Sequence, residues 1–355
     1  MIRVLHLMAQ SPDFQTQRAA NILAQKLGQG INVTTRTIGP RGDYRNALTA
    51  YFSFAGKLEK YDLIHAWGLP MLLLSSYMQA PRLVFTPTEW PTLRSIRKAR
   101  LAMKNRELHI VCSSELEREI YLEHEYPKDR CHCIPPGVDV GRAKDKPGPR
   151  LRASLGFAEE DYVLLAPGES TRAAGHHDAL WAASILHVLD RRYKILLWGR
   201  GEQTGNCVRL AEKLHQPTLL TLAEEKLGGR VNFDELLPAA DAVLYTPVRA
   251  IPVLPIAMCL GARLPIVSTP TPWFADILKD GENCIQVPRR SSRMLAQRVI
   301  ELREDAGVLS RIAGAGRKTA GDIFSKTGFA KGYREIYREL ASGFPILESL
   351  LREIL

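Results

Sequence analysis

Residues 166–189 combine a glycine-containing loop with the start of a helical pattern, and this combination can bind an anion. The N–H groups in the first turn of a helix have no partner inside the helix, and together with the helix dipole they favour phosphate. An arginine in the loop could add a guanidinium to the same anion. The candidate binding residues are Gly168, Glu169, Ser170, Arg172 and Gly175. An ordinary strand–helix turn is the alternative interpretation of this segment.

A second glycine-rich turn follows the apolar run at 193–199. Gly199 would let the backbone lie close to a base or a ribose, because glycine has no side chain. The turn lacks the full G-x-G-x-x-G fingerprint of dinucleotide-binding proteins, so tight turn geometry explains it equally well. Two histidines, His176 and His177, fall in the helical turn after the first loop. One of them could contact phosphate, and a surface position is the alternative.

Strand-like and helix-like patterns alternate along almost the whole chain, which predicts parallel sheets covered on both faces. The first series of apolar runs comprises residues 2–8, 31–38, 61–68, 82–86, 108–113 and 131–135. The second series comprises residues 161–168, 193–199, 230–234, 241–247, 264–269 and 283–288. Helices are expected between these runs, including one at 15–28 and one at 44–60, and helical segments close the chain over 291–355.

A segment rich in Gly, Pro and charge at 137–156 separates the two series and is typical of a linker. The sequence therefore predicts an α/β protein with two Rossmann-like, doubly wound domains that face a cleft. In such sheets, ligands gather at the carboxyl ends of the strands. His65 and His109 lie within or beside apolar strands, so we expect both to be core histidines with satisfied hydrogen bonds.

The net charge of +10 is concentrated in the first half of the chain, where Lys and Arg exceed Asp and Glu by eight. A basic amphipathic helix is predicted within 91–109, and it could rest on an anionic membrane surface. A solvated helix that packs on the sheet is the alternative. Nucleic-acid binding is not favoured, because no aromatic interleaving or recognition module accompanies the charge.

The six cysteines form no C-x-x-C pair, so we expect reduced thiols, no metal site and a cytoplasmic protein. The sequence contains no run of about 18 apolar residues, so no membrane-spanning helix is predicted. The short apolar segment at the start is not typical of a signal peptide. The basic helix would make the protein peripheral at the inner face of the membrane.

Separated segments of the chain resemble motifs of the family-4 glycosyltransferases, which are group 1 retaining enzymes with the GT-B fold. The segments occur in the same order as the motifs of that family. These segments are "YDLIHAWG" (61–68), "IVCSSELERE" (110–119), "CIPPGVD" (133–139), "LLWGRGEQ" (196–203), "RVNFDELLPAADAVLYTP" (230–247), "AMCLGARLPIVST" (257–269), "DILKDGENCIQVP" (276–288) and "FAKGYREIYREL" (329–340). The resemblance implies a UDP- or GDP-sugar donor as substrate and no cofactor or metal.

The resemblance also implies an organisation into four parts. They are an acceptor-side Rossmann-like domain at 1–138, a linker at 139–160, a donor-nucleotide domain at 161–328, and C-terminal helices at 329–355 that cross back to the first domain.

The sequence departs from the family at the positions that bind the donor. Val248 and Ile256 stand where the family has two glutamates separated by seven residues. Glu169 and Ala174 stand where it has an arginine and a lysine that contact the donor diphosphate. An apolar side chain cannot hydrogen-bond a sugar hydroxyl, and a carboxylate near a diphosphate is repulsive.

We therefore expect backbone N–H groups at 168–175 and 249–252 to hold the phosphate. Arg172 or Arg249 would replace the lost cations. The donor-binding residues expected on the second segment are Val248, Arg249, Ala250, Ile251 and Ile256.

Glu89, in the segment "TPTEW", lies near a position where the family often has a histidine. It could act as a catalytic base toward an acceptor hydroxyl, and a solvated loop acid is the alternative. Two functions remain open. The first is a glycosyltransferase with altered donor recognition, and the second is a catalytically inactive glycosyltransferase-like protein that acts as a binding or scaffolding partner. A GT-B epimerase is a minor third possibility.

Overall fold

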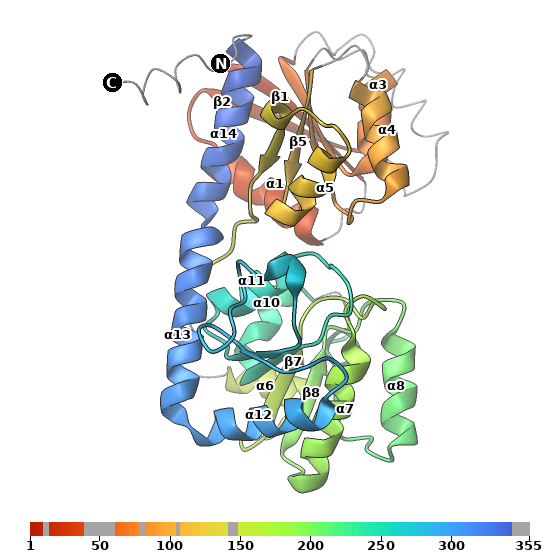
Figure 1. Ribbon diagram of the computed structural model, residues 1–355, viewed down its shortest axis with the longest axis vertical. Helices are drawn as coiled ribbons and strands as arrows, with labels where there is room; N and C mark the ends of the chain where they lie inside the picture. Colours follow the sequence, from red (N-terminus) through yellow and green to blue (C-terminus); the bar gives the residue numbers. More distant parts are fainter. Residues whose placement is uncertain are drawn as a thin grey trace. The chain divides into compact units, whose positions relative to one another are not determined.

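The computed structural model describes residues 1–9, 14–38, 61–77, 82–103, 107–140, 148–229 and 231–342. The chain divides into two compact units (Figure 1). Unit 1 comprises Met1–Gly137 and Lys326–Leu355, and unit 2 comprises Val138–Ser325. The helix expected at 44–60 lies outside the described residues.

Unit 1 is built on a parallel sheet in the order β2-β1-β3-β4-β5-β6. Its strands are β1 (Ile2–Ala9), β2 (Ile31–Ile38), β3 (Leu63–Trp67), β4 (Arg82–Thr86), β5 (Glu107–Cys112) and β6 (Cys131–Cys133). The central strands are almost completely buried, which explains why they are near-continuous apolar runs rather than alternating patterns.

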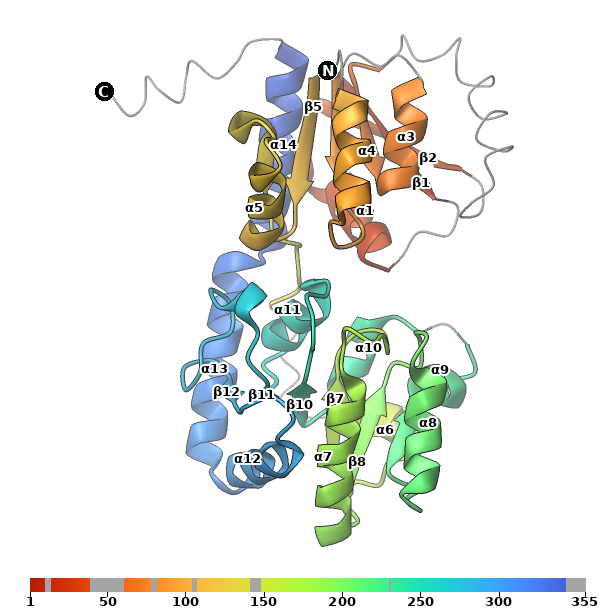
Figure 2. The same cartoon turned by 45° about the vertical axis from the view of Figure 1, so that its right-hand side comes forward.

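Helices cover both faces of the sheet in unit 1 (Figure 2). One face packs against α3 (Leu69–Tyr77), α4 (Leu93–Met103) and α5 (Glu115–Glu123). The other face packs against α1 (Phe14–Lys26) and α14 (Lys326–Ser342). Helix α14 thus joins the sheet of unit 1 although almost two hundred residues separate it from β6 in the sequence.

A buried polar network fixes α14 to the sheet. The Nδ1 atom of His65 lies 2.6 Å from the hydroxyl of Tyr337, and its Nε2 atom lies 2.8 Å from Oγ1 of Thr86. Tyr333 contacts Thr86 at 2.9 Å, and Nε2 of His6 contacts Tyr337 at 2.9 Å. Both ring nitrogens of the buried His65 are therefore satisfied, which confirms the expected core role of this residue.

Unit 2 contains a second parallel sheet in the order β12-β11-β10-β7-β8-β9. Its strands are β7 (Tyr162–Ala166), β8 (Tyr193–Leu197), β9 (Leu220–Leu222), β10 (Ala242–Tyr245), β11 (Ile266–Ser268) and β12 (Ile285–Gln286). The helices are α6 (Pro149–Leu155), α7 (His176–Leu189), α8 (Thr204–Lys213), α9 (Ala223–Lys226), α10 (Phe233–Leu236), α11 (Leu254–Gly261), α12 (Ser292–Glu304) and α13 (Ala306–Ile323). Side chains of α7, α8 and α12 share one buried core with the sheet.

Two local predictions in unit 2 are corrected by the structure. The strand expected at 230–234 is wrong, because Phe233 begins helix α10 and the sixth strand is β9. Val231 and Phe233 are both buried, and apolar residues two positions apart give the sequence pattern of a strand. The described residues of this segment nevertheless pair with no strand. The expected linker at 139–160 also contains a helix, α6, whose Arg152 forms an ion pair with Asp241.

Candidate functional site

The N-terminus of helix α7 lies at the carboxyl edge of the sheet in unit 2, directly after the loop that follows β7. Gly175 precedes the helix with φ +66°, and its carbonyl accepts a hydrogen bond from Oγ1 of Thr246 at 2.9 Å. A Cβ atom at Gly175 would stand 2.0 Å from the carbonyl oxygen of Thr246, so only glycine fits here. The helix has 14 residues. The N–H of Asp178 donates to the carbonyl of Gly175 at 2.9 Å, and the N–H groups of His176 and His177 precede it in the first turn, where a helix supplies no acceptor.

The side chain of Ser170 supports the loop from inside, which corrects its expected role as a ligand contact. Ser170 is fully buried, and its Oγ lies 2.9 Å from Nδ1 of His176. The Nε2 atom of His176 lies 3.2 Å from the carbonyl of Pro167. Since a carbonyl only accepts, Nε2 carries the proton and Nδ1 accepts the hydroxyl hydrogen of Ser170. Burial lowers the pKa of His176 to about 4, so the ring is neutral and is not a phosphate ligand.

The loop after β7 is also joined to the glycine turn after β8. The N–H of Ser170 donates to the carbonyl of Arg200 at 2.6 Å, and the N–H of Gln203 donates to the carbonyl of Ser170 at 2.8 Å. A Cβ atom at Gly201, where φ is +111°, would lie 2.4 Å from the carbonyl oxygen of Ser170. The loop after β7 and the glycine turn after β8, which contains Gly199, are therefore held together by backbone hydrogen bonds.

The segment after β10 packs against the same loop. The N–H groups of Val248 and Arg249 donate to the carbonyl of Ala173 at 2.8 and 3.4 Å. The expectation that the N–H of Arg249 faces a phosphate is therefore wrong, because the protein already uses it. Val248 is 40% exposed, whereas Ile256 is fully buried in α11 and cannot touch a ligand. Among the other expected contacts, Ile251 is buried and Ala250 is half-buried.

Arg289 was missed by the sequence analysis and stands at the same edge of unit 2, three residues after β12. Its guanidinium donates to the carbonyls of Val248 and Pro270, both at 3.3 Å, and lies 5.2 Å from the ring centroid of Trp273. The segment "PRR" carries no motif. The only signal is its position after a parallel strand, where ligand-binding residues gather.

Four exposed arginines consequently lie at or beside this edge: Arg172, Arg249, Arg289 and its neighbour Arg290. Within the described ranges, none of them forms an ion pair with an Asp or Glu side chain. Arg200 differs, because it pairs with Glu224 and stacks over the ring of Trp198. The expected cation Arg172 carries its charge in solvent, while its backbone N–H lies 3.4 Å from Oε1 of Glu202.

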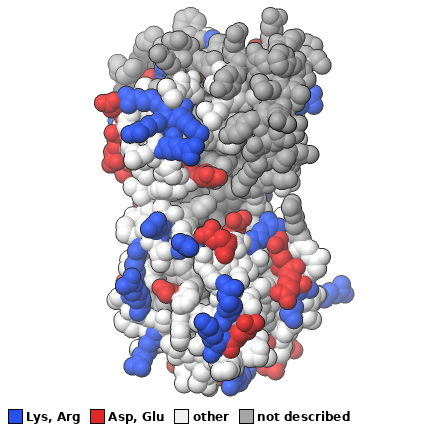
Figure 3. Space-filling model, turned by 90° about the vertical axis from the view of Figure 1, so that its right-hand side faces the viewer, with Lys and Arg blue, Asp and Glu red and all other residues white. Residues whose placement is uncertain are grey.

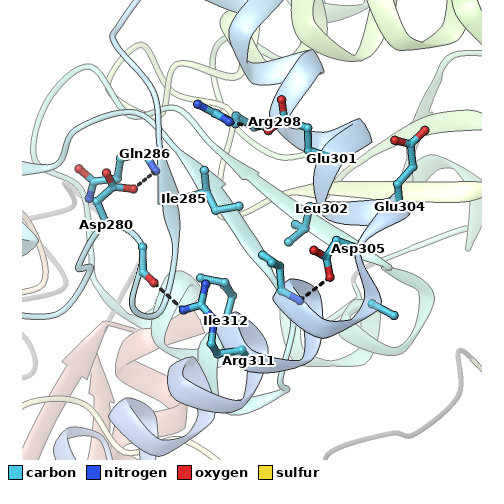
Figure 4. A pocket seen from close by; sticks show the side chains of 13 residues that line it. Asp280, Ile285, Gln286, Arg298, Glu301, Leu302, Glu304, Asp305, Arg311 and Ile312 are labelled. Atoms are coloured by element: carbon cyan, nitrogen blue, oxygen red, sulfur yellow. Dashed lines mark hydrogen bonds and ion pairs between the residues drawn. The ribbon is translucent and has the colours of Figure 1, made fainter.

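A large cavity of unit 2, about 780 Å³, lies away from this edge, beside the edge strand β12 and between α12 and α13 (Figure 4). Most of its charged groups already have partners. Arg298 pairs with Glu301, Arg311 donates to the carbonyl of Gly281 at 2.7 Å, and Asp280 accepts the N–H of Gln286 at 2.7 Å. None of the residues expected to bind a ligand lines this cavity.

Glu89 lies on the loop after β4 in unit 1, where it is exposed. A small cavity of about 20 Å³ opens at the carboxyl ends of β3, β4 and β5, and its lining includes Thr86, Cys112 and Tyr333 but not Glu89. The proposed role of Glu89 as a base stays a prediction. In the described part of the chain, no group of three or more His, Cys, Asp or Glu side chains is arranged to hold a metal ion.

The sequence matches two family models that together cover most of the chain. Residues 5–142 match the model "Glycosyltransferase Family 4", and residues 148–319 match "Glycosyl transferases group 1". The chain belongs to the group 1 glycosyltransferases. A curated relative, the Bacillus subtilis protein named "Putative glycosyltransferase EpsD", is 25% identical over 171 residues. This match spans 48% of the present chain and 44% of the relative.

Solved structures confirm the GT-B fold of this glycosyltransferase family member. The Anabaena protein HepE, solved in complex with UDP and glucose, has a TM-score of 0.78 at 16% identity. That match covers 96% of this chain and 100% of HepE. A glycosyltransferase from Rickettsia africae has a TM-score of 0.74 at 15% identity, over 97% of this chain and 99% of its own. At these identities the likeness concerns the fold alone.

Proposed function

We propose that this group 1 glycosyltransferase transfers a sugar from a UDP- or GDP-sugar to an acceptor. Family membership and the fold support this activity, and HepE has been solved with UDP-glucose as well as with UDP. The observation that carries the proposal is the α7 N-terminus. There, the glycine at position 175 and the contacts from Thr246 and Val248 hold the loop in one conformation.

In the proposed complex, the N–H groups of His176 and His177 at the start of α7 hold the diphosphate without a metal. The helix dipole favours the negative charge, and Arg172 and Arg249 supply the guanidinium groups. Because this electrostatic frame is fixed before the reaction, it also stabilises the charge that develops on the departing diphosphate.

Nucleotide binding tests the proposal directly. A ligand that binds only the folded protein stabilises it by about 2.7 kcal/mol at a hundred times its Kd, so saturating UDP or GDP is expected to raise the Tm by several degrees. Arg172→Ala should weaken binding of the responding nucleotide about tenfold. An unchanged Tm with UDP, GDP and their glucose and mannose conjugates would contradict donor binding.

A second candidate function is binding without transfer, and the two family positions held by Val248 and Ile256 favour it. Neither side chain can accept a hydrogen bond from a sugar hydroxyl, and Ile256 has no exposed surface. The two candidates differ in turnover. An active enzyme releases UDP or GDP from its donor when acceptor is present, whereas an inactive protein binds the donor and leaves it intact.

Helix α4 supports a further part of the proposal, an anionic membrane surface as partner. Lys and Arg side chains gather on one face of unit 1 (Figure 3). On α4, Arg94 and Arg97 are exposed beside two exposed leucines, Leu93 at 60% and Leu101 at 73%. The apolar side of the predicted amphipathic helix is therefore divided, because Ile96 and Ala99 pack in the core while Leu93 faces solvent, and Leu101 is a further exposed leucine.

We accordingly expect the protein to sediment with vesicles that contain phosphatidylglycerol but not with pure phosphatidylcholine vesicles. Binding should fall steeply between 50 and 500 mM salt, since these charges are exposed. Replacing Leu93 and Leu101 by Asn should reduce binding about tenfold, because each removes apolar area that would enter the interface. Equal binding to both vesicle types would contradict the membrane proposal and the expected peripheral location. No helix in the described residues is long and apolar enough to cross a membrane.

A further inference from the structure

The residues that directly follow β10 and β11 offer a ligand few exposed side-chain acceptors. Residues 246–253 and 268–275 contain no carboxylate and no carboxamide. Their four hydroxyl side chains are almost completely buried: Thr246, Ser268, Thr269 and Thr271. The exposed charged side chains that follow β10, β11 and β12 most directly are Arg249, Asp276, Arg289 and Arg290. A neutral sugar, whose hydroxyl groups require acceptors, has few partners here.

Arg289 is held in place before any ligand arrives. It spans two loops through the carbonyls of Val248 and Pro270, and it stacks over Trp273. A guanidinium has five N–H donors, and these two bonds leave the others available. A fixed guanidinium loses little conformational entropy on binding and matches the planar geometry of a carboxylate.

Two acidic residues of the edge, Glu169 and Glu202, lie on the other side of the sheet order, whereas the exposed Asp276 lies in the connection after β11. Glu169 and Glu202 follow β7 and β8, and the loop that holds Glu169 is bonded to the turn after β8. Arg289 follows β12, at the opposite end of the order β12-β11-β10-β7-β8-β9. Val248 connects the two regions, because its N–H donates to Ala173 in the loop before α7 and its carbonyl accepts from Arg289. An anionic group could thus reach Arg289 from a diphosphate at α7.

We propose that the donor carries a sugar with a carboxylate, of the uronic acid class, and that Arg289 binds this carboxylate. The inference rests on the proposed nucleotide-sugar site and names the class of its substrate. Arg289 is then a specificity-determining residue: it selects among nucleotide sugars by charge, while the α7 N-terminus binds the diphosphate that all of them share.

Matched pairs of ligands test this proposal by titration calorimetry. The pairs are UDP-glucuronate with UDP-glucose, UDP-galacturonate with UDP-galactose, and GDP-mannuronate with GDP-mannose. In at least one pair, we expect the carboxylate-bearing member to bind about tenfold more tightly, which corresponds to one charge-assisted contact of about 1.4 kcal/mol. Arg289→Ala should bring the ratio of the two Kd values close to one while the affinity for UDP or GDP alone changes little. Arg289→Lys should restore part of the ratio.

Arg290 provides the control for general attraction between a basic protein and an anion. It is the exposed neighbour of Arg289 with φ +60°, so Arg290→Asn removes one charge with a residue that tolerates this conformation. The ratio should survive in this variant. Equal affinity within every pair, or a ratio that persists in Arg289→Ala, would overturn the inference while nucleotide binding stands. Failure of UDP, GDP and all six conjugates to bind would overturn the proposed function, and the inference with it.

Discussion

Gly175→Ala is expected to destabilise the protein by about 3 kcal/mol or more and to weaken nucleotide binding about a hundredfold. The new Cβ would stand 2.0 Å from the carbonyl oxygen of Thr246, a contact that only a backbone shift can relieve. That shift would break the hydrogen bond from Thr246 to Gly175 and move the start of α7. The alanine must also adopt φ +66°, a left-handed conformation that costs about 1–2 kcal/mol by itself.

Gly228→Ala separates these two contributions. Gly228 has almost the same φ, +69°, but a Cβ there would meet nothing within 4 Å. Gly228→Ala should lower the free energy of unfolding only by the cost of the left-handed backbone conformation, about 1 kcal/mol, and should leave nucleotide affinity unchanged. Unfolding in urea measures both variants. If Gly175→Ala were no more damaging than Gly228→Ala, the close approach between the two loops would not hold the α7 N-terminus in place.

Acidification is expected to destabilise the folded protein between pH 6.5 and about 4, partly through His176. Burial lowers the pKa of His176 from 6.5 to about 4 in the folded state. Between these two pH values the unfolded chain binds a proton that the folded chain does not bind, so the free energy of unfolding falls as the pH falls. The stability is complete above pH 6.5, and the full loss corresponds to about 3 kcal/mol for this residue.

Other buried groups act in the same window. Burial lowers the pKa of His6 to about 3 and that of His109 and His132 to about 4, and these three residues all lie in unit 1. Glu117 acts in the opposite direction, because burial raises its pKa to about 7 and the folded state then gains a proton as the pH falls. Unit 1 therefore combines opposing contributions, and His176 in unit 2 gives the cleaner test.

His176→Gln is expected to lower the free energy of unfolding at pH 7.5, because it loses the contact with Ser170. From pH 7.5 to 5.5 the variant should then lose about 1 kcal/mol less than the wild type, since glutamine does not titrate. His177→Gln, at an exposed position on the same turn, serves as the matched control and should preserve the wild-type pH dependence. A variant that keeps the full loss between these two pH values would refute the role of His176.

The sequence determined the fold class and the order of most elements, because buried parallel strands require apolar runs and the helices between them require helical spacing. It failed at 230–234, where two buried apolar residues two positions apart also occur in an irregular turn. It also located the loops after β7 and β8, since glycine is needed where backbones approach closely, as at Gly175 and Gly201.

Only the tertiary structure decided which groups in those loops remain available to a ligand. Ser170 and His176 bond to each other, Arg249 gives its N–H to Ala173, and Ile256 is buried, although all of them lie in segments that the sequence marked. Arg289 joined the edge because parallel strands bring their carboxyl ends together regardless of their distance along the chain. The residue types of a segment set what it can bind, but the contacts between strands far apart in sequence set which of its groups are already occupied.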